Sequence, residues 1–485
     1  MSSESKIQIM PFLFRREEKE IFVTTVHGDF YWIPRAEFNK LLDSSFGLSD
    51  NITQDLISRQ ILAIDVEQSI DAAATKLRSR KAFLRSFTSL HMLVTTLRCN
   101  QRCEYCQVSC ADNDAVQFDM SIEIAEKIVN TIFQSPSPSI KIEFQGGEPT
   151  LNWEIIPFVI EYAENLNLKF KKNVEFVVCT NLTAMTKEKF EYLHSHNVFV
   201  STSLDGPKDI HDLCRKQRIG HTSYDLFVQN LELGRSIMGL DKIDALMTTS
   251  KQSLSRFKEI IDEYVRLGFH GIFLRSLNPY GFAAEQAEAL GYSSEDFFEF
   301  YKKCLEYIIS LNASGTVFTE YYTALLFKRI MTSQSTGFVD LQSPSGAGIS
   351  GAIYDYNGDV YPADEGRMLA RMGDERFKMG NVAKDSFKQI FTGQIIGEIV
   401  ENSCLETIPG CSDCVYSPYC GADPIRNYLE YGTIIGRNPG SNFCKKNMLI
   451  FDYLFNKIKE NDNLFLDTLW SWIVPNTEGV AHENV

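Results

Sequence analysis

The chain has 485 residues and a formal net charge of −15 at pH 7, and 44% of its residues are hydrophobic. This length predicts two to four domains, and the hydrophobic content is sufficient for sizeable cores. The acidic balance argues against nucleic acid as the main partner, because phosphate binding needs basic clusters. No apolar run suits a signal peptide or a membrane span, so the twelve cysteines favour a cytoplasmic protein with reduced thiols and no membrane contact.

Residues 1–87 are expected to form a small α+β domain. Residues 20–25 and 28–33 predict a β-hairpin, and residues 35–42 and 51–59 predict two short helices. Two interpretations stay open for this domain. It is either a decoration of the main domain or a peptide-docking module with an exposed strand edge.

Residues 88–285 alternate apolar strands with amphipathic helices. Strands that are apolar nearly throughout are typical of parallel sheets buried on both faces. Six such units predict an α/β fold, a partial (β/α)6 TIM-like barrel in which chemistry lies at the carboxyl ends of the strands. The expected strands are 91–96, 140–145, 174–180, 199–204, 243–249 and 271–276.

The remaining residues predict a helical bridge and a cysteine-containing domain. Residues 353–362 are expected to form a hairpin with a type I′ turn at Asn357-Gly358. Residues 448–472 are expected to form one closing helix, followed by a mobile tail. The expected segments are 286–340 for the bridge, 341–450 for the cysteine-containing domain and 451–485 for the C-terminal helix and tail.

Three cysteines follow the first expected barrel strand with the spacing C-x3-C-x2-C: Cys99, Cys103 and Cys106. Three thiolates from one loop can hold three irons of a [4Fe–4S] cluster and leave the fourth iron open to a ligand that is not protein. An open iron is typical of a catalytic cluster. The alternative is a structural zinc site, which would need a fourth ligand.

This cysteine loop resembles the signature of the radical SAM superfamily. An aromatic residue precedes the third cysteine, and the segment FQGGEP, from Phe144 to Pro149, follows the second strand. The resemblance implies an S-adenosylmethionine (SAM) site in which Arg215 pairs with the SAM carboxylate; the alternative for Arg215 is a surface salt bridge. Cys179 is interpreted as a small buried apolar residue. The residues implied in SAM binding are Tyr105, Gln145, Gly146, Gly147, Glu148, Thr180, Asn181, Ser203, Asp205 and Arg215.

The C-terminal cysteines have the spacing C-x2-C-x5-C followed by a distant cysteine, which resembles part of the SPASM domain. The resemblance implies one auxiliary [4Fe–4S] cluster, with a four-thiolate zinc site as the alternative. Ala363 and Pro424 stand where ligands of a second auxiliary cluster would lie, and Cys404 is interpreted as a spare thiol. The implied ligands are Cys411, Cys414, Cys420 and Cys444.

Two adjacent carboxylates are candidate catalytic residues. In sulfatase-maturing relatives an Asp that follows the missing cysteine acts as a base, and Asp364 stands at that place with Glu365 beside it. A carboxylate there could accept a proton as a substrate radical is oxidised. The alternative is a solvated turn carboxylate.

Longer blocks, among them SPSPSIKIEFQGGEPTLN and PGCSDCVYSPYCGADP, resemble the His-Xaa-Ser system radical SAM maturase over residues 80–450. This resemblance implies an oxidoreductase that forms an oxidative side-chain cross-link on a ribosomal precursor peptide through a 5′-deoxyadenosyl radical. It also implies an electron donor such as flavodoxin or ferredoxin, and a leader-peptide recognition element in residues 1–87. The alternatives are a formylglycine-forming sulfatase maturase, an iron–sulfur electron carrier without SAM chemistry, and a leader-peptide scaffold.

Overall fold

The structure is a computed structural model that describes residues 7–43, 47–220 and 222–474. The chain divides into two compact units. The first unit comprises Met1–Arg85, Leu325–Gly346 and Ile399–Phe451, and the second comprises Ser86–Ala324, Ala347–Glu398 and Asp452–Val485. Three of the helices are α13 (Tyr321–Met331), α16 (Gln394–Asn402) and α18 (Asn442–Glu460).

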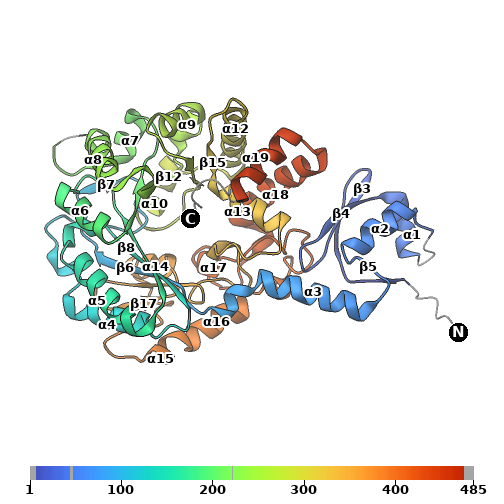
Figure 1. Cartoon of the computed structure of the whole chain (residues 1–485), viewed down its shortest axis with the longest axis horizontal. Coiled ribbons are helices and arrows are strands. Elements are labelled where there is room, and N and C mark those ends of the chain that lie inside the picture. Colours follow the sequence, from blue (N-terminus) through green and yellow to red (C-terminus); the bar gives the residue numbers. More distant parts are fainter. Residues whose placement is uncertain (1–6, 44–46, 221, 475–485) are drawn as a thin grey trace. The chain divides into compact units, whose positions relative to one another are not determined.

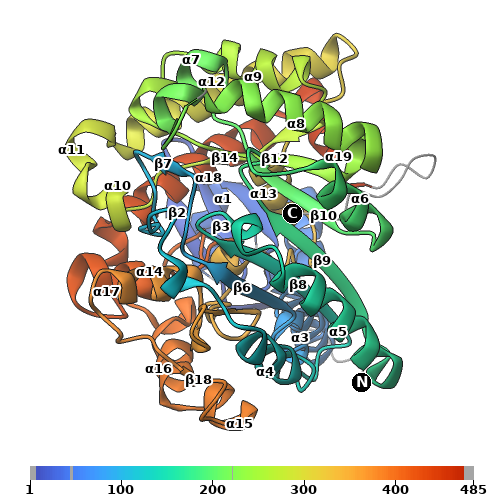
Figure 2. The same cartoon turned by 90° about the vertical axis from the view of Figure 1, so that its left-hand side faces the viewer.

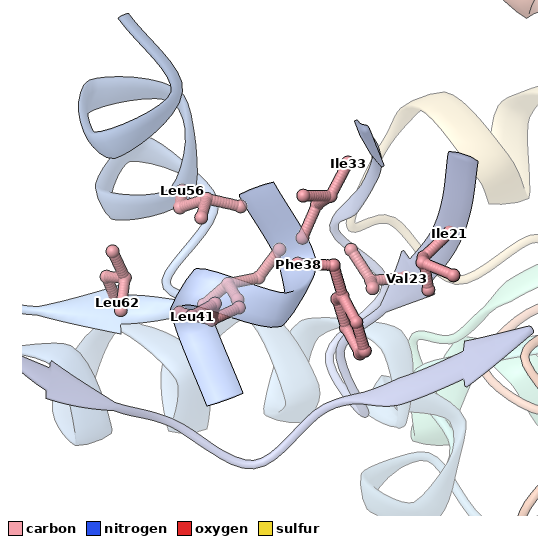
Figure 3. Close-up of a cluster of buried hydrophobic side chains, with 8 residues drawn as sticks. Ile21, Val23, Ile33, Phe38, Leu41, Leu56 and Leu62 are labelled. Atoms are coloured by element: carbon pink, nitrogen blue, oxygen red, sulfur yellow. The ribbon is translucent and has the colours of Figure 1, made fainter. Parts of the chain in front are cut away.

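The N-terminal segment of the first unit has the α+β structure that the sequence predicts. Its three-stranded antiparallel sheet has the order β2-β3-β4, so β2 and β4 are the edge strands. Buried side chains from the sheet, including Val23 and Ile33, pack against Phe38, Leu41 and Leu56 of the helices (Figure 3). The elements of this unit are β1 (Gln8–Ile9), β2 (Leu13–Arg16), β3 (Glu20–Thr24), β4 (Phe30–Pro34), α1 (Arg35–Leu42), α2 (Asp50–Ser58), β5 (Leu62–Ala63), α3 (Val66–Arg80) and α17 (Pro424–Tyr431).

The second unit contains the expected partial barrel. Its parallel strands lie in the order β14-β12-β10-β9-β8-β6, and the helices that connect them cover the outer face (Figures 1 and 2). The strands are β6 (Leu90–Thr96), β8 (Ser139–Gly146), β9 (Asn173–Cys179), β10 (Phe199–Ser203), β12 (Ile243–Thr248) and β14 (Leu274–Arg275). The covering helices are α4 (Ile122–Ile132), α5 (Ile155–Phe170), α6 (Lys187–Ser195), α7 (Lys208–Cys214), α8 (Ser223–Met238) and α9 (Phe257–Arg266).

Local sequence explains why these helices form where they do. Ser121 caps α4, because its hydroxyl accepts the backbone N–H of Ile124 at 3.3 Å. The apolar face of this helix, which includes Ile128, Val129 and Ile132, is fully buried. Each such aliphatic side chain contributes about 1.5–3 kcal/mol through burial.

The sheet extends beyond the barrel through the C-terminal part of the unit. Strand β16 (Gly351–Tyr354) pairs parallel to β6, with Ile353 opposite Met92, and β17 (Asp359–Tyr361) and β18 (Gly380–Asn381) continue the sheet. The hairpin that the sequence predicts is therefore a neighbour of the first barrel strand. The remaining elements are β7 (Gln101–Cys103), β11 (Arg215–Gln217), β15 (Thr319–Glu320), α10 (Gly281–Glu285), α11 (Ala287–Leu290), α12 (Ser294–Ala313), α14 (Asp364–Arg371), α15 (Phe387–Phe391) and α19 (Asn463–Ile473).

Three expectations about these elements are wrong. The sixth strand is broken, because β13 (Gly271–Ile272) pairs with β15 and only β14 pairs with the barrel strand β12. The 353–362 hairpin has no type I′ turn, since only Gly358 (φ +85°) has a positive φ in its loop. The closing helix is two helices, α18 and α19, separated by Asn461 at φ +52°.

The tail that was expected to be mobile lies, from residue 475 onward, outside the described residues. Within the described ranges, no helix combines the length and the apolar character needed to cross a membrane.

Candidate active site

The cysteine loop lies at the carboxyl end of β6, the first barrel strand, as the sequence predicts. Cys99 follows that strand, and the backbone of Cys103 pairs antiparallel with Arg215 through β7 and β11. The carbonyl of Cys106 accepts the N–H of Phe282, at the start of α10, at 2.9 Å. Burial raises the pKa of the Cys103 thiol, so bare thiolates are costly here and a bound cation would compensate them. This donor set fits a cluster held by three thiolates.

The two glycines of the FQGGEP segment bring the end of β8 against the cysteine loop. A Cβ atom at Gly146 would lie 2.1 Å from the carbonyl oxygen of Thr96, and one at Gly147 would lie 2.3 Å from that of Arg98. The Gly147 N–H donates to the Thr96 carbonyl at 2.9 Å. Both glycines are therefore required for backbone packing around the loop, whether or not a ligand approaches them.

Glu148 is a buried carboxylate with four protein donors. It accepts the N–H and hydroxyl of Thr150, the hydroxyl of Thr180 at 2.7 Å and the N–H of Asn181 at 2.8 Å. Burial raises the pKa of Glu148, and these donors partly offset that effect. The side chain of Asn181 donates to Asn100 inside the cysteine loop at 2.9 Å. Three predicted SAM-binding residues therefore form one network with the loop.

Arg215 forms a buried ion pair. Its Nε donates to Asp205 Oδ2 at 2.9 Å and its Nη2 to Asp205 Oδ1 at 3.3 Å, and its guanidinium lies 5.3 Å from the ring centroid of Tyr105. The Tyr105 hydroxyl donates to the same carboxylate. Burial opposes the charge of Arg215, but Asp205 together with other nearby groups outweighs burial, so the pKa of Arg215 is raised. The surface-salt-bridge alternative is wrong, and Arg215, Asp205 and Tyr105 act as one unit beside Cys103.

A second polar cluster lies on neighbouring strands of the barrel. The Cys179 thiol on β9 donates to Glu143 Oε1 on β8 at 3.2 Å, and the Gln145 amide donates to the same oxygen. Burial, and then the nearby Glu143, raise the pKa of Cys179, so the thiol keeps its proton. The interpretation of Cys179 as a purely apolar residue is wrong. Ser203 is half-buried at the end of β10.

Asp364 is the first residue of α14 and is not a solvated turn carboxylate. The Arg367 guanidinium donates to Asp364 Oδ1 through Nε at 2.9 Å and Nη2 at 2.7 Å. Arg367 is 1% exposed, and its Nη1 has no hydrogen-bond partner. The Arg367 guanidinium also interacts electrostatically with Cys106 of the cysteine loop. Asp364 also interacts electrostatically with the Cys179 thiol and is a minor cause of its raised pKa. Glu365 is half-buried at the second position of the helix.

The four C-terminal cysteines of the expected auxiliary site line one cavity within the first unit. Its volume is about 340 Å³, compared with the roughly 30 Å³ that a water molecule occupies in the liquid. Burial raises the pKa of Cys411 and of Cys444 to about 12, which again favours thiolates only beside a cation. Cys404 is not among the lining residues, and its thiol donates to the Val400 carbonyl. The lining thiols belong to Cys411, Cys414, Cys420 and Cys444.

The sequence-based predictions missed three residues of the barrel site. Cys110 contacts the thiols of Cys99 and Cys106, and its spacing of four residues after Cys106 was the available signal. Glu143 is a carboxylate inside an otherwise apolar strand and shares a strand face with Gln145, which could have marked it. The spacing of Arg367, three residues after Asp364, was the available signal for their ion pair, whereas the place of α14 near the cysteine loop had no local signal.

The barrel matches a family model described as the Radical SAM superfamily over residues 93–263. A cysteine-type anaerobic sulfatase-maturating enzyme of Clostridium novyi (strain NT) is 24% identical over 358 residues, covering 70% of this chain and 88% of the relative. The solved structure of native anSMEcpe with bound AdoMet and Cp18Cys peptide superposes with a TM-score of 0.64 at 20% identity, covering 79% of this chain and 99% of that chain. Streptococcus suis SuiB bound to its precursor peptide SuiA gives a TM-score of 0.53 at 15% identity, covering 89% and 98%.

These likenesses and the cysteine loop define the class of protein. It has an α/β partial barrel with a C-terminal region like the SPASM domain of the anaerobic sulfatase-maturating enzymes. The protein is a radical SAM enzyme, with a [4Fe–4S] cluster and S-adenosylmethionine as the cofactors of its barrel.

Proposed function

We propose that this enzyme joins two side chains of a ribosomally made precursor peptide by an oxidative cross-link. The observation that carries the proposal is the cluster of Glu143, Cys179 and Asp364, which places two carboxylates and a protonated thiol in the same unit as the cysteine loop. The proteins that resemble this chain over most of its length include structures with bound peptides. The longer sequence blocks that resemble the His-Xaa-Ser system maturase support a precursor peptide as the substrate.

The residues of the chain have separate tasks in this proposal. When bound, the [4Fe–4S] cluster and S-adenosylmethionine would supply a 5′-deoxyadenosyl radical that abstracts a hydrogen atom from the peptide. Cys99, Cys103 and Cys106 would hold the cluster. The Glu148 network and the Arg215–Asp205 pair keep the loop rigid around it. Asp364, with its ion pair to Arg367, would accept the proton that is lost when the substrate is oxidised.

The C-terminal cavity would hold one auxiliary [4Fe–4S] cluster on Cys411, Cys414, Cys420 and Cys444. Among the described residues, no three His, Cys, Asp or Glu side chains converge as a single metal ion requires. The four thiols are among the residues that line one cavity of about 340 Å³, which has room for a cluster, and this supports a cluster over the zinc alternative. A flavodoxin or ferredoxin would supply electrons to the enzyme.

We also propose that the N-terminal segment binds the leader part of the precursor. Strand β4 is an edge of its sheet, and an extended peptide can add to such an edge by main-chain hydrogen bonds. Fluorescence anisotropy with the full chain should show tight binding of the leader segment and weak binding of the core segment. Turnover of a leaderless precursor at the full rate would contradict this role.

A second candidate is formylglycine formation, because the Clostridium novyi relative of which the chain covers 88% is a sulfatase-maturating enzyme. Mass spectrometry of the peptide product distinguishes the two. A cross-link removes two hydrogens and joins two residues in fragmentation spectra. Formylglycine leaves one residue with an aldehyde that a hydrazine reagent traps, and this result would replace our proposal.

A further inference from the structure

Two buried arginines lie side by side next to the auxiliary cavity of the first unit. Arg80 ends α3 and Arg329 belongs to α13, and each is 5% exposed. Nη1 of Arg80 donates to the carbonyl of Arg329 at 2.9 Å. Arg329 in turn donates to the carbonyls of Tyr419 at 2.8 Å and of Cys420 at 3.4 Å. A predicted cluster ligand is thus in direct contact with a buried guanidinium.

The charges of the two arginines are not neutralised by ion pairs. In the part of the chain that the structure describes, neither forms a salt bridge with a carboxylate, and their hydrogen bonds go to backbone carbonyls. The two carboxylates that influence them most already have cationic partners: Asp29 pairs with Lys76, and Glu406 pairs with Lys81. The region therefore has an excess of positive charge.

Arg329 keeps its charge in spite of this environment. A guanidinium stays protonated even when it is buried, because its ordinary pKa lies far above neutral pH. Glu406 also lies near Arg329, but it already pairs with Lys81 at 2.5 Å. Cys420 also accepts a weak hydrogen bond from the Asn447 amide, at 3.6 Å from its sulfur.

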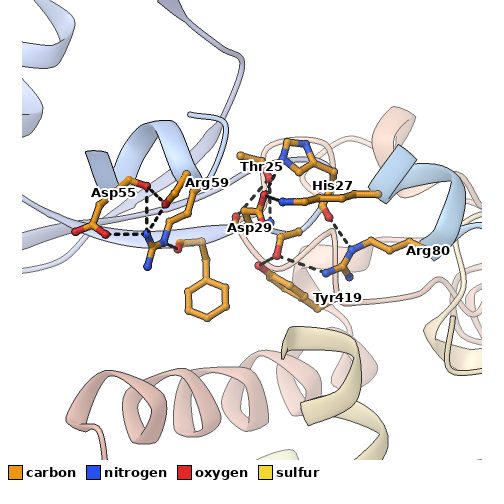
Figure 4. Close-up of polar contacts among 11 residues, drawn as sticks. Thr25, His27, Asp29, Asp55, Arg59, Arg80 and Tyr419 are labelled. Carbon is orange, nitrogen blue, oxygen red and sulfur yellow. Dashed lines mark hydrogen bonds and ion pairs between the residues drawn. The ribbon is translucent and has the colours of Figure 1, made fainter. Parts of the chain in front are cut away.

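The N-terminal hairpin packs against Arg80, whose guanidinium lies beside His27 and Tyr419 (Figure 4). Arg80 donates to the carbonyls of His27 at 2.7 Å and Gly28 at 3.4 Å, and the Tyr419 hydroxyl also donates to Gly28, at 3.1 Å. Gly28 has φ +91°, and a Cβ atom there would lie 2.2 Å from the Arg80 guanidinium. The hairpin is packed so closely that little water reaches the charges, and dissolved salt will screen them little.

A cluster bound by four thiolates becomes more negative when it gains an electron. Its reduction potential depends on nearby charge, on hydrogen bonds and on exposure. Positive charge that solvent does not screen stabilises the reduced cluster, which is the more negative of its two oxidation states, and so raises the reduction potential. We propose that Arg329, supported by Arg80, raises the reduction potential of the auxiliary cluster so that it accepts the electron that the substrate radical loses.

This inference rests on the proposed auxiliary cluster. In the step it describes, the substrate carbon radical loses one electron to the cluster, the new bond closes with loss of one proton to a carboxylate, and the cluster is reduced by one electron. The electron then passes to a soluble one-electron carrier protein.

The test is a redox titration followed by electron paramagnetic resonance. The protein is the full chain carrying Cys99→Ala, Cys103→Ala and Cys106→Ala, so that only the auxiliary cluster gives a signal. Adding Arg329→Gln should reduce the equilibrium constant for one-electron reduction about tenfold, which corresponds to about 59 mV toward more negative potential. Arg329→Lys should keep most of the original potential, because it keeps the charge. Arg59→Gln, which removes another arginine bonded to a backbone carbonyl, should cause no shift.

Each result has one meaning. An unchanged potential in Arg329→Gln, or equal shifts in Arg329→Gln and Arg329→Lys, overturns the inference, since the effect would then not follow the charge. If Arg329→Gln does not fold, Arg80→Gln is titrated and a smaller shift of the same sign is expected; no shift overturns the inference. Protein that binds zinc or no iron in the triple-cysteine background contradicts the auxiliary cluster itself, which separates that failure from failure of the arginine effect.

Discussion

The Arg367 guanidinium holds Asp364 through two nitrogens on one carboxylate oxygen, at 2.9 and 2.7 Å, while its third nitrogen stays without a partner in the buried interior. This leaves Oδ2 of Asp364 available to a substrate proton. Asp364→Asn should therefore lower peptide product formation at least about 100-fold, the usual minimum for a general base. SAM cleavage without peptide should continue, which liquid chromatography of 5′-deoxyadenosine measures.

Glu365→Gln is the matched variant, because it removes the adjacent carboxylate on the same helix. The geometry assigns the proton to Asp364, so Glu365→Gln should keep most of the product yield. The reverse pattern, with Glu365→Gln inactive and Asp364→Asn active, would transfer the catalytic role to Glu365.

Glu143 accepts hydrogen bonds from Cys179 and Gln145 on the barrel strands. Glu143→Gln replaces an acceptor by a group that also donates, so the Cys179 thiol and the Gln145 amide lose a common anionic partner. We expect the KM for the peptide to rise several-fold, while the rate of 5′-deoxyadenosine formation stays unchanged. Cys179→Ser keeps a donor to Glu143 and should behave like the parent enzyme. A Glu143→Gln enzyme with unchanged peptide kinetics would show that this cluster lies outside the substrate path.

Gly147→Ala should disrupt the barrel cluster site, because the new methyl group would lie 2.3 Å from the Arg98 carbonyl, which cannot move without the cysteine loop. The expected result is loss of about half of the bound iron and of SAM binding, measured by iron analysis and calorimetry. Gly397→Ala is the control: it lies exposed in α16, no atom is within 4 Å of its Cβ position, and it should stabilise the helix by up to about 1 kcal/mol. Full SAM affinity in Gly147→Ala would refute the packing argument.

His91 predicts the pH dependence of the stability of the iron-free protein. It is fully buried between the Tyr354 hydroxyl and the Thr88 carbonyl, and burial lowers its pKa to about 3. The unfolded chain, with an ordinary histidine pKa near 6.5, therefore binds a proton that the folded chain does not bind. The stability that His91 contributes is complete above pH 6.5 and decreases by about 1.4 kcal/mol per pH unit below it.

Urea unfolding at pH 7, 6 and 5 measures this slope. The His91→Gln protein cannot bind this proton in either state. Between pH 6.5 and 5, its unfolding free energy should therefore fall less steeply, by up to about 1.4 kcal/mol per pH unit, which is the contribution of one proton. Equal slopes in the two proteins would mean that His91 is not buried in its neutral form.

The strands of the barrel were predictable because each is an apolar run that ends where a polar motif begins, as β8 does at Gly146. The break in the sixth strand was not predictable, because it depends on the pairing of β13 with β15, a strand that lies far along the chain. The cysteine loop and the FQGGEP segment are marked by spacing alone. Arg367, the partner of Asp364, stands three residues away on the same helix, a local spacing that the sequence shows. In contrast, the partner of Arg329 depends on a tertiary contact, since Arg80 and Arg329 are 249 residues apart in the chain.

The most direct test of the account is the formation of 5′-deoxyadenosine by anaerobically reconstituted protein with reductant and SAM. The wild-type enzyme and the Cys404→Ala control should form it, and Cys99→Ala should not, because the third thiolate of the barrel cluster would be missing. Formation of 5′-deoxyadenosine by Cys99→Ala at the wild-type rate, or none by the wild-type enzyme with its iron in place, would contradict the assignment of the barrel as a radical SAM site.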